Sequence, residues 1–303
     1  MIESPSNRIS THHILGAGVL FAAIFPPAAF GQTEKAGGGN KVARGGDRAL
    51  IVVGLPGDVE HSASFLELAR SYRQWLVGPL GFADAGVRTL FGASGEPSLK
   101  AAAATREAIA SEAAAARGAV TAEGRLWVII VGHANERGGH TFLHLPGPDL
   151  REDELGRLFD GITCREQVFW ITTAASGGFL RALSAKGRIV ITATTAEQEL
   201  NETEFPHALG EVCRQSFAEL DEDNDKKVSV WDVFLHLGKL VDARFAADKR
   251  TPTEHALLDD NGDQIGTERP GKGEDDVKRE SGKHSRVRDG ELARKTILPL
   301  EGR

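Results

Sequence analysis

The sequence is short of several features that define whole classes of protein. It has only two cysteines, Cys164 and Cys213, in 303 residues, which is too few for a metal site built from thiolates. Whether these two pair depends on a geometry that their spacing does not set. Lys and Arg number 36 against 43 Asp and Glu, so no basic face for nucleic acid is expected. Low aromatic content (6%) and 35 glycines favour an α/β scaffold over an all-β sandwich.

Long apolar runs are also scarce, and the first one lies close to the start of the chain. Residues 14–30 (ILGAGVLFAAIFPPAAF) follow Arg8 and are too short and too rich in Gly and Pro for a comfortable membrane span. Ala29 and Gly31 stand where a signal peptidase cleaves. We predict a signal peptide over residues 1–31 and export to the periplasm or beyond; the alternative is an uncleaved membrane anchor. No second run of membrane length follows, so no other stable span is expected.

The body of the chain alternates between strand and helix patterns. Residues 32–47 are Gly-rich and polar, typical of a flexible linker. An Ala-rich helix is predicted over 99–117 and a shorter one over 150–159. Five apolar strands are predicted, over residues 49–54, 87–92, 126–132, 167–173 and 188–194. Continuous apolar strands separated by helices predict a three-layer α/β domain over 48–205, with a parallel sheet covered on both faces.

In such sheets the chemistry lies in the loops beyond the carboxyl ends of the strands. His133 directly follows the third strand and is well placed as a general base. After the fourth strand, TTAASGGFL predicts a sharp strand-to-helix turn that can present a nucleophile and backbone donors. Other polar side chains can line the same site, although turn and cap roles explain them as well; they are Asp58, Glu60, His61, Glu197 and Glu199.

These segments resemble a known family. VIIVGHANERGG is similar to the strand–Gly–His segment of caspases, gingipains and legumains, and VFWITTAASGGFL is similar to their nucleophile segment. The resemblance implies a caspase/legumain-like domain in which His133 falls on the histidine of the cysteine-peptidase dyad. Ser176 and Gly177 fall on the Ser-Gly after the nucleophile, and Ala174 falls on the nucleophile itself. RIVITATTAEQE is similar to the strand that follows in legumains, of the type found in exported bacterial proteins.

The departure at Ala174 decides the functional prediction. A methyl group can neither attack a carbonyl carbon nor be activated by His133. We therefore predict a catalytically inactive peptidase homologue that binds a peptide, a protein or an ion. The alternative is a hydrolase with His133 as base and an atypical nucleophile such as Ser176. Cys164 precedes the fourth strand and so lies at the wrong end of it, about 20 Å away.

A second motif lies in LDEDNDKKVSVWDVF, which resembles the calcium loop of an EF-hand. Its expected ligands are the side chains of Asp221, Asp223, Asp225 and Asp232 together with the backbone of Lys227. Lys226 replaces the usual glycine and Asp232 the usual glutamate, so we predict weak Ca²⁺ binding, with a Kd of roughly 0.1–1 mM. A solvated acidic turn is the alternative. If the loop is the functional part, the protein is a calcium-dependent extracytoplasmic interaction module.

The C-terminal third is predicted to differ from the core. Residues 206–268 form a small helical EF-hand-like appendage, with two helices around the acidic loop. The run LLDDNGDQIGTE predicts an Asx-rich turn or an incomplete ion loop, because Pro270 at its twelfth position cannot bind an ion. Residues 269–303 are highly charged with few apolar side chains, which predicts a disordered tail.

Overall fold

A computed structural model describes residues 46–195, 199–268 and 289–300. The predicted signal peptide, nearly all of the predicted linker, Glu197 and most of the predicted tail lie outside these residues. The last linker residue, Asp47, belongs to the domain instead, because its buried carboxylate accepts hydrogen bonds from the backbone and guanidinium of Arg125. In the described part of the chain, no helix is long and apolar enough to cross a membrane.

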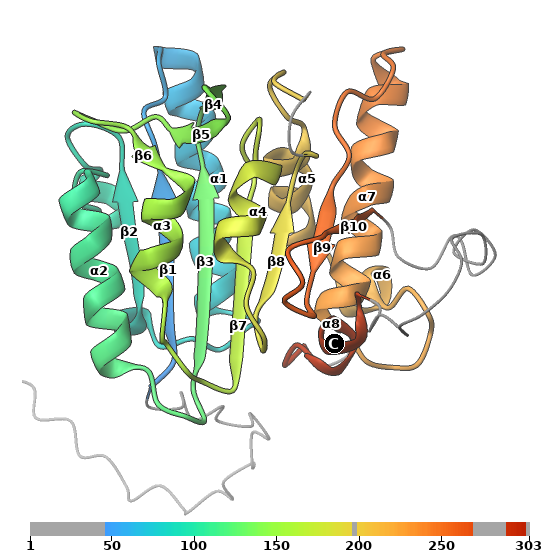
Figure 1. Cartoon of the computed structure of the whole chain (residues 1–303). Helices are drawn as coiled ribbons and strands as arrows, with labels where there is room; N and C mark the ends of the chain where they lie inside the picture. The colour runs from blue at the N-terminus through green and yellow to red at the C-terminus, as the bar shows by residue number, and fades with distance from the viewer. Residues whose placement is uncertain (1–45, 196–198, 269–288, 301–303) are drawn as a thin grey trace, which may run out of the picture. The chain divides into compact units, whose positions relative to one another are not determined.

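The centre of the fold is a seven-stranded sheet in the order β10-β9-β8-β7-β3-β1-β2 (Figure 1). The five strands predicted from apolar runs are confirmed to within about two residues at each end and pair in parallel. The seven strands of the whole sheet are β1 (Arg48–Val53), β2 (Val87–Phe91), β3 (Arg125–Val131), β7 (Glu166–Ile171), β8 (Ile189–Thr192), β9 (Leu257–Asp259) and β10 (Thr267–Glu268). The last two were not predicted, and they add to the sheet in the antiparallel sense.

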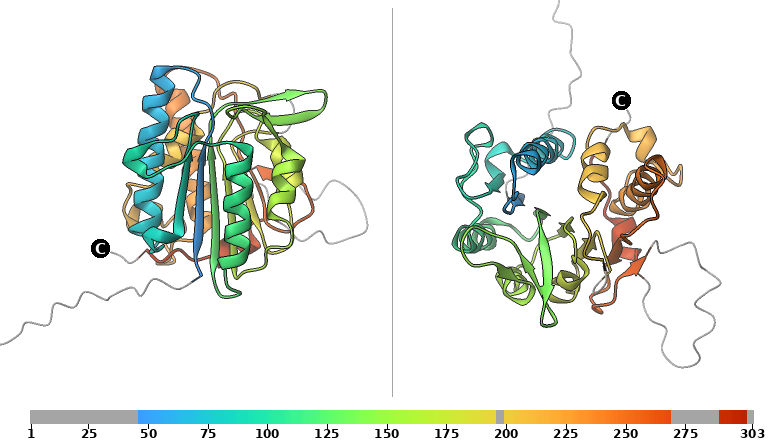
Figure 2. Two further views of the ribbon diagram at one scale, coloured as in Figure 1. Left: turned by 90° about the vertical axis from the view of Figure 1, so that its left-hand side faces the viewer. Right: turned by 90° about the horizontal axis from the view of Figure 1, so that it is seen from above.

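Helices cover both faces of this sheet, which confirms the predicted three-layer α/β class (Figure 2). Successive residues of β3 point to opposite faces, so Trp127 and Ile129 enter one core and Val128 the other. One face is covered by α1 (Val59–Val77), α5 (Phe205–Val212) and α7 (Val230–Ala247), and the other by α2 (Arg106–Ala119), α3 (Glu152–Phe159) and α4 (Gly177–Leu183). The shorter elements are α6 (Phe217–Leu220), α8 (Glu291–Lys295), two 3-10 turns (Asp84–Gly86 and Pro97–Leu99) and a small sheet of β4 (Ala134–Arg137), β5 (His140–Leu143) and β6 (Leu150–Arg151).

Two predicted helices begin later than their composition indicates. The Ala-rich helix starts at Arg106 rather than at residue 99, because Thr105 caps it by accepting the Ala108 N–H (3.2 Å). The alanines before it bond to other segments, with Ala102 accepting from Phe91 (2.8 Å). Likewise, residues 150–151 pair with β5, and the helix α3 follows them. In both places tertiary hydrogen bonds override helix propensity.

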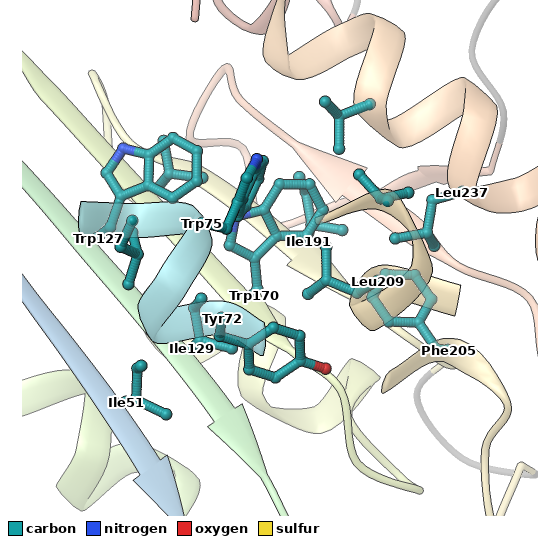
Figure 3. Close-up of a cluster of buried hydrophobic side chains, with 14 of the residues drawn as sticks. Ile51, Tyr72, Trp75, Trp127, Ile129, Trp170, Ile191, Phe205, Leu209 and Leu237 are labelled. Carbon is teal, nitrogen blue, oxygen red and sulfur yellow. The ribbon is translucent and has the colours of Figure 1, made fainter. Parts of the chain in front are cut away.

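The C-terminal region shares the core of the α/β domain instead of forming a separate appendage. Phe205, Leu209 and Leu237 of α5 and α7 pack against Trp170 and Ile191 of the sheet (Figure 3). Three helices are present around the acidic loop, since α6 forms a short turn of its own. Residues 289–300 also depart from the predicted disorder: they include α8, whose Ala293 is fully buried.

Candidate functional site

The residue after β3 is held at the carboxyl edge of the sheet by backbone contacts. Gly132 has φ +143°, and a side chain there would press on the backbone of Gly54. His133 is half-buried, and its Nε2 lies 3.0 Å from the carbonyl oxygen of Pro56. Because a carbonyl only accepts hydrogen bonds, Nε2 is the donor in this contact. The loop after β1 therefore fixes the orientation of the His133 ring.

The turn after β7 is fixed by hydrogen bonds and contains one residue with a left-handed backbone. Thr172 fixes its start by donating its backbone N–H (3.0 Å) and its hydroxyl (2.8 Å) to the carbonyl of Ile130. Ala174 is half-buried, and Ala175 has the left-handed φ of +50°, which is rare for a residue with a side chain. The N–H of Ala175 donates to the carbonyl of Glu199 at 2.9 Å. The N–H of Ala175 is thus already paired with the loop after β8.

Ser176, the alternative nucleophile, is fully buried behind this turn. Its hydroxyl oxygen accepts the N–H of Thr194 (3.0 Å) and lies 3.1 Å from the Thr194 hydroxyl. These bonds join the turn to the end of β8. The serine is therefore engaged in holding two loops together and is not presented to a substrate.

The cysteines offer no substitute. Both are free, so no disulfide joins them. Cys164 precedes β7, as predicted, and its thiol donates to the carbonyl of Glu166. Burial raises the pKa of both thiols, which opposes formation of a nucleophilic thiolate.

A small pocket brings the two predicted dyad positions together. Its volume is about 20 Å³, and His133 and Ala174 both line it. The other lining residues are Phe65, Val131, Gly132, Glu202, Thr203, Pro206 and His207. A space of this size holds about one water molecule. A ligand larger than this must bind across its mouth or displace the 199–204 loop.

His61 lies beside His133. Its ring lies edge-to-face with that of His133, with 5.1 Å between centroids. Nδ1 of His61 bonds to Asp58 (2.7 Å) and Nε2 to Glu202 (3.0 Å). These bonds, that of Asp58 first, raise the pKa of His61 and favour the imidazolium, which donates from both nitrogens. Asp58 also caps α1, which is the cap role offered for it from the sequence. Glu202 was not predicted.

The acidic loop between α6 and α7 gathers three of its predicted ligands. Carboxylate oxygens of Asp221, Asp223 and Asp225 lie within 4.8 Å of one another. The loop is tightened by backbone donors, with the Lys226 N–H 3.1 Å from Asp221 and the Lys227 N–H 2.8 Å from Asp225. Lys226 has φ +66°, the conformation that glycine would adopt at less cost. The loop thus keeps a strained turn that gathers negative charge.

Asp232, the predicted last ligand, lies outside that group of three and is buried at the start of α7. Its Oδ2 accepts the N–H of Ser229 (2.8 Å) in a capping box. Among the described residues, neither its Oδ1 nor the buried Oδ1 of Asp221 has a hydrogen-bond partner. Burial, followed by repulsion from Asp223 and Asp225, raises the pKa of Asp232. Buried carboxylate oxygens are normally paired, so these two stand out within the described part of the chain.

The second acidic run forms the predicted Asx-rich turn. Asp259 is almost fully buried and accepts the N–H groups of Gly262 (2.9 Å) and Gln264 (3.2 Å). Asn261 accepts the N–H of Asp263 at 2.7 Å. These side chains satisfy their own backbone.

Comparisons with known proteins found likeness to solved structures. No protein-family model matches the chain, and no curated protein matches its sequence. The chain is similar to the Drosophila initiator caspase Dronc, with 12% identity and a TM-score of 0.46 over 83% of this chain and 97% of that one. It is also similar to a secreted C11 cysteine protease from Bacteroides thetaiotaomicron, with 9% identity and a TM-score of 0.36 over 72% of this chain and 67% of that one. Its structural neighbours thus include a caspase and a C11 cysteine protease, and the likeness concerns the fold alone.

Proposed function

We propose that this protein is an exported caspase/legumain-like peptidase homologue that lacks peptidase activity and binds a peptide or protein at the His133 pocket. The observation that carries the proposal is Ala174, a methyl group on a turn that otherwise keeps its strained shape. Export rests on the N-terminal sequence.

Three contacts argue against catalysis by other means. The Ala175 N–H donates to the carbonyl of Glu199, so it is not available to stabilise an oxyanion. The hydroxyl of Ser176 is buried against Thr194. Cys164 lies at the opposite end of β7. A base without an accessible nucleophile cannot run acyl transfer by the covalent route.

The segments around the pocket favour binding of a peptide. His61, in the first turn of α1, joins this helix to Glu202 in the loop after β8. Two apolar side chains stand exposed on the same two segments, Val59 at the start of α1 (87%) and Leu200 in the loop after β8 (55%). Apolar side chains beside the carboxylates of Asp58 and Glu202 suit a peptide that presents apolar and basic groups.

The test uses covalent probes. Wild type is expected to cleave no peptide in a library and to react with no serine- or cysteine-directed probe at this pocket. Ala174→Cys is expected to be alkylated by iodoacetamide, more slowly when His133→Ala is added, because the histidine can then no longer take the thiol proton. Ala119→Cys, on α2, is the matched control and should react at a rate independent of His133. Cleavage or labelling of wild type that depends on His133 would contradict the proposal.

We propose a second function, weak calcium binding in the loop 221–232. The specific observation in its favour is the pair of buried carboxylate oxygens, on Asp221 and Asp232, that have no hydrogen-bond partner within the described ranges. A cation held by Asp221, Asp223 and Asp225, with the Lys227 carbonyl and Asp232 completing its shell, would satisfy both. Lys226 and Lys227 reduce the local negative potential, which supports a Kd of roughly 0.1–1 mM. Through this loop the protein would act as a calcium-dependent extracytoplasmic module.

Calorimetric titration with CaCl₂ tests this second proposal. Wild type should show one weak binding event, and Asp223→Ala should lose it. Asp263→Ala, in the other acidic loop, is the matched control and should retain it. A wild-type protein that gives no heat would remove calcium from the function.

A further inference from the structure

The C-terminal segment 289–300 is hydrogen-bonded to the exit of the acidic loop. The N–H of Val230 donates to the carbonyl of Thr296 (3.0 Å), and the N–H of Leu298 donates to the carbonyl of Val228 (2.8 Å). Between these bonds, Ser229 and Ile297 form an antiparallel bridge. The segment thus pairs with the last part of the loop 221–232 through one antiparallel bridge and the two hydrogen bonds beside it.

Side chains reinforce this pairing around one aromatic residue. Trp231 is buried, and the guanidinium carbon of Arg294 lies 3.9 Å from the centre of its ring. Gly290, with φ +96°, lies against the same ring, where a Cβ would collide with it. Leu298 is buried to 3% exposure. The docked segment therefore covers Trp231, the residue just before Asp232.

The other end of the segment is fixed to the second acidic loop. The carboxylate of Asp260 accepts the N–H groups of Gly290 (2.9 Å) and Ala293 (2.8 Å). In return, Asp289 accepts the N–H of Asp260 (3.3 Å) and the hydroxyl of Thr267. Segment 289–300 therefore joins the loop 221–232 to the Asx-rich turn 259–263.

We propose that calcium binding in the loop 221–232 and docking of segment 289–300 are coupled, so that each strengthens the other. This inference rests on the calcium binding proposed above. The link is residues 228–232: Ser229 holds the Asp232 carboxylate through the capping box, and the residues on either side of Ser229 bond to the segment. When the segment is docked, the loop exit is ordered and Asp232 is held near the other carboxylates.

If the segment detaches, ion binding must itself order the loop exit, and this lowers the apparent affinity. Linkage makes the effect reciprocal, because calcium must favour docking by the same factor by which docking favours calcium. We expect a factor of about 10, within the range of ordinary coupling between sites.

The test combines calorimetry with hydrogen exchange on the full chain. Gly290→Ala and Leu298→Asp are designed to detach the segment, by collision with Trp231 and by burial of a charge. Gly187→Ala is the control, because Gly187 also has a left-handed φ (+83°) but an added Cβ would meet nothing within 4 Å. In wild type, calcium should slow exchange of the amides of residues 290–298. Both detaching variants should exchange these amides fast and bind calcium about 10-fold more weakly, while Gly187→Ala keeps the wild-type affinity.

The two proposals fail in different ways. If wild type gives no heat with calcium, the ion site itself is wrong, and the coupling falls with it. If wild type binds calcium and the variants expose the segment but bind calcium as tightly as wild type, only the coupling is overturned. Calcium that leaves exchange of residues 290–298 unchanged in wild type overturns the coupling as well.

Discussion

Glu254 provides a stability prediction with a defined pH dependence. It lies before β9, is 6% exposed and accepts the Glu204 N–H at the start of α5 with both oxygens (3.1 and 3.0 Å). Among the described residues no cationic side chain is paired with it. Burial first, and then the charges of Glu204 and Glu199, raise its pKa to about 8.

The sign follows from where the proton is bound. Between its usual pKa of 4.5 and its folded pKa of about 8, Glu254 holds a proton in the folded protein and loses it on unfolding. The free energy of unfolding therefore falls as pH rises through this window. A difference of one in pKa corresponds to about 1.4 kcal/mol. The free energy of unfolding is therefore lowered by about 3 kcal/mol at pH 7 and by at most about 5 kcal/mol above pH 8.

Glu254→Gln removes this titration and keeps an acceptor for the Glu204 N–H. We expect the variant to match wild type near pH 5 and to have a free energy of unfolding about 4 kcal/mol higher than wild type at pH 8. Urea denaturation at pH 5, 6, 7, 8 and 9 measures the difference, in which the contributions of other titrating groups cancel. Glu107→Gln, an exposed site on α2, is the control and should follow wild type. If wild type and Glu254→Gln stay parallel from pH 5 to 9, the reasoning is refuted.

Three further substitutions test other parts of the structure. Asp47→Asn breaks the buried pair with Arg125 (side chains 1% and 9% exposed) and should cost about 3–5 kcal/mol in urea unfolding; an unchanged midpoint would contradict the pairing. Lys226→Gly removes the strain of a left-handed backbone, which costs about 1 kcal/mol, and should tighten calcium binding measured by calorimetry. Weaker binding by the variant would show that the lysine side chain supports the ion site. Gly156→Ala places a Cβ against the carbonyl of Ala182 where α3 meets α4, and we expect a loss of about 1–3 kcal/mol, which a Tm equal to wild type would exclude.

The parts of the fold visible in the sequence are those set by local pattern. Strands buried on both faces give continuous apolar runs, so all five parallel strands were predicted. Their shared carboxyl edge also explains why His133 and Ala174, 41 residues apart in the sequence, line one pocket. The order of strands and helices in the sequence was enough to predict that these two residues lie together.

What the sequence did not predict depends on contacts between distant segments. Glu202 reaches His61 across 141 residues, and no periodic pattern marks such a pair. The strand β9 has three residues, too few for alternation to be read, and it is fixed by pairing with β8. The docking of residues 289–300 is likewise invisible in their composition, because it depends on backbone bonds to Val228 and Val230.

The backbone strain in the turn at Ala174 supports a binding role. Ala175 holds a left-handed backbone that costs about 1–2 kcal/mol, and such strain persists only where the surroundings impose it. Here the surroundings are the Glu199 carbonyl on one side and the bonds between Ser176 and Thr194 on the other. In an enzyme this strain would serve a nucleophile, and this chain has none at that position. The same contacts fix the loops after β7 and β8 beside His133, so what they preserve is the shape of a pocket wall and not a reacting group.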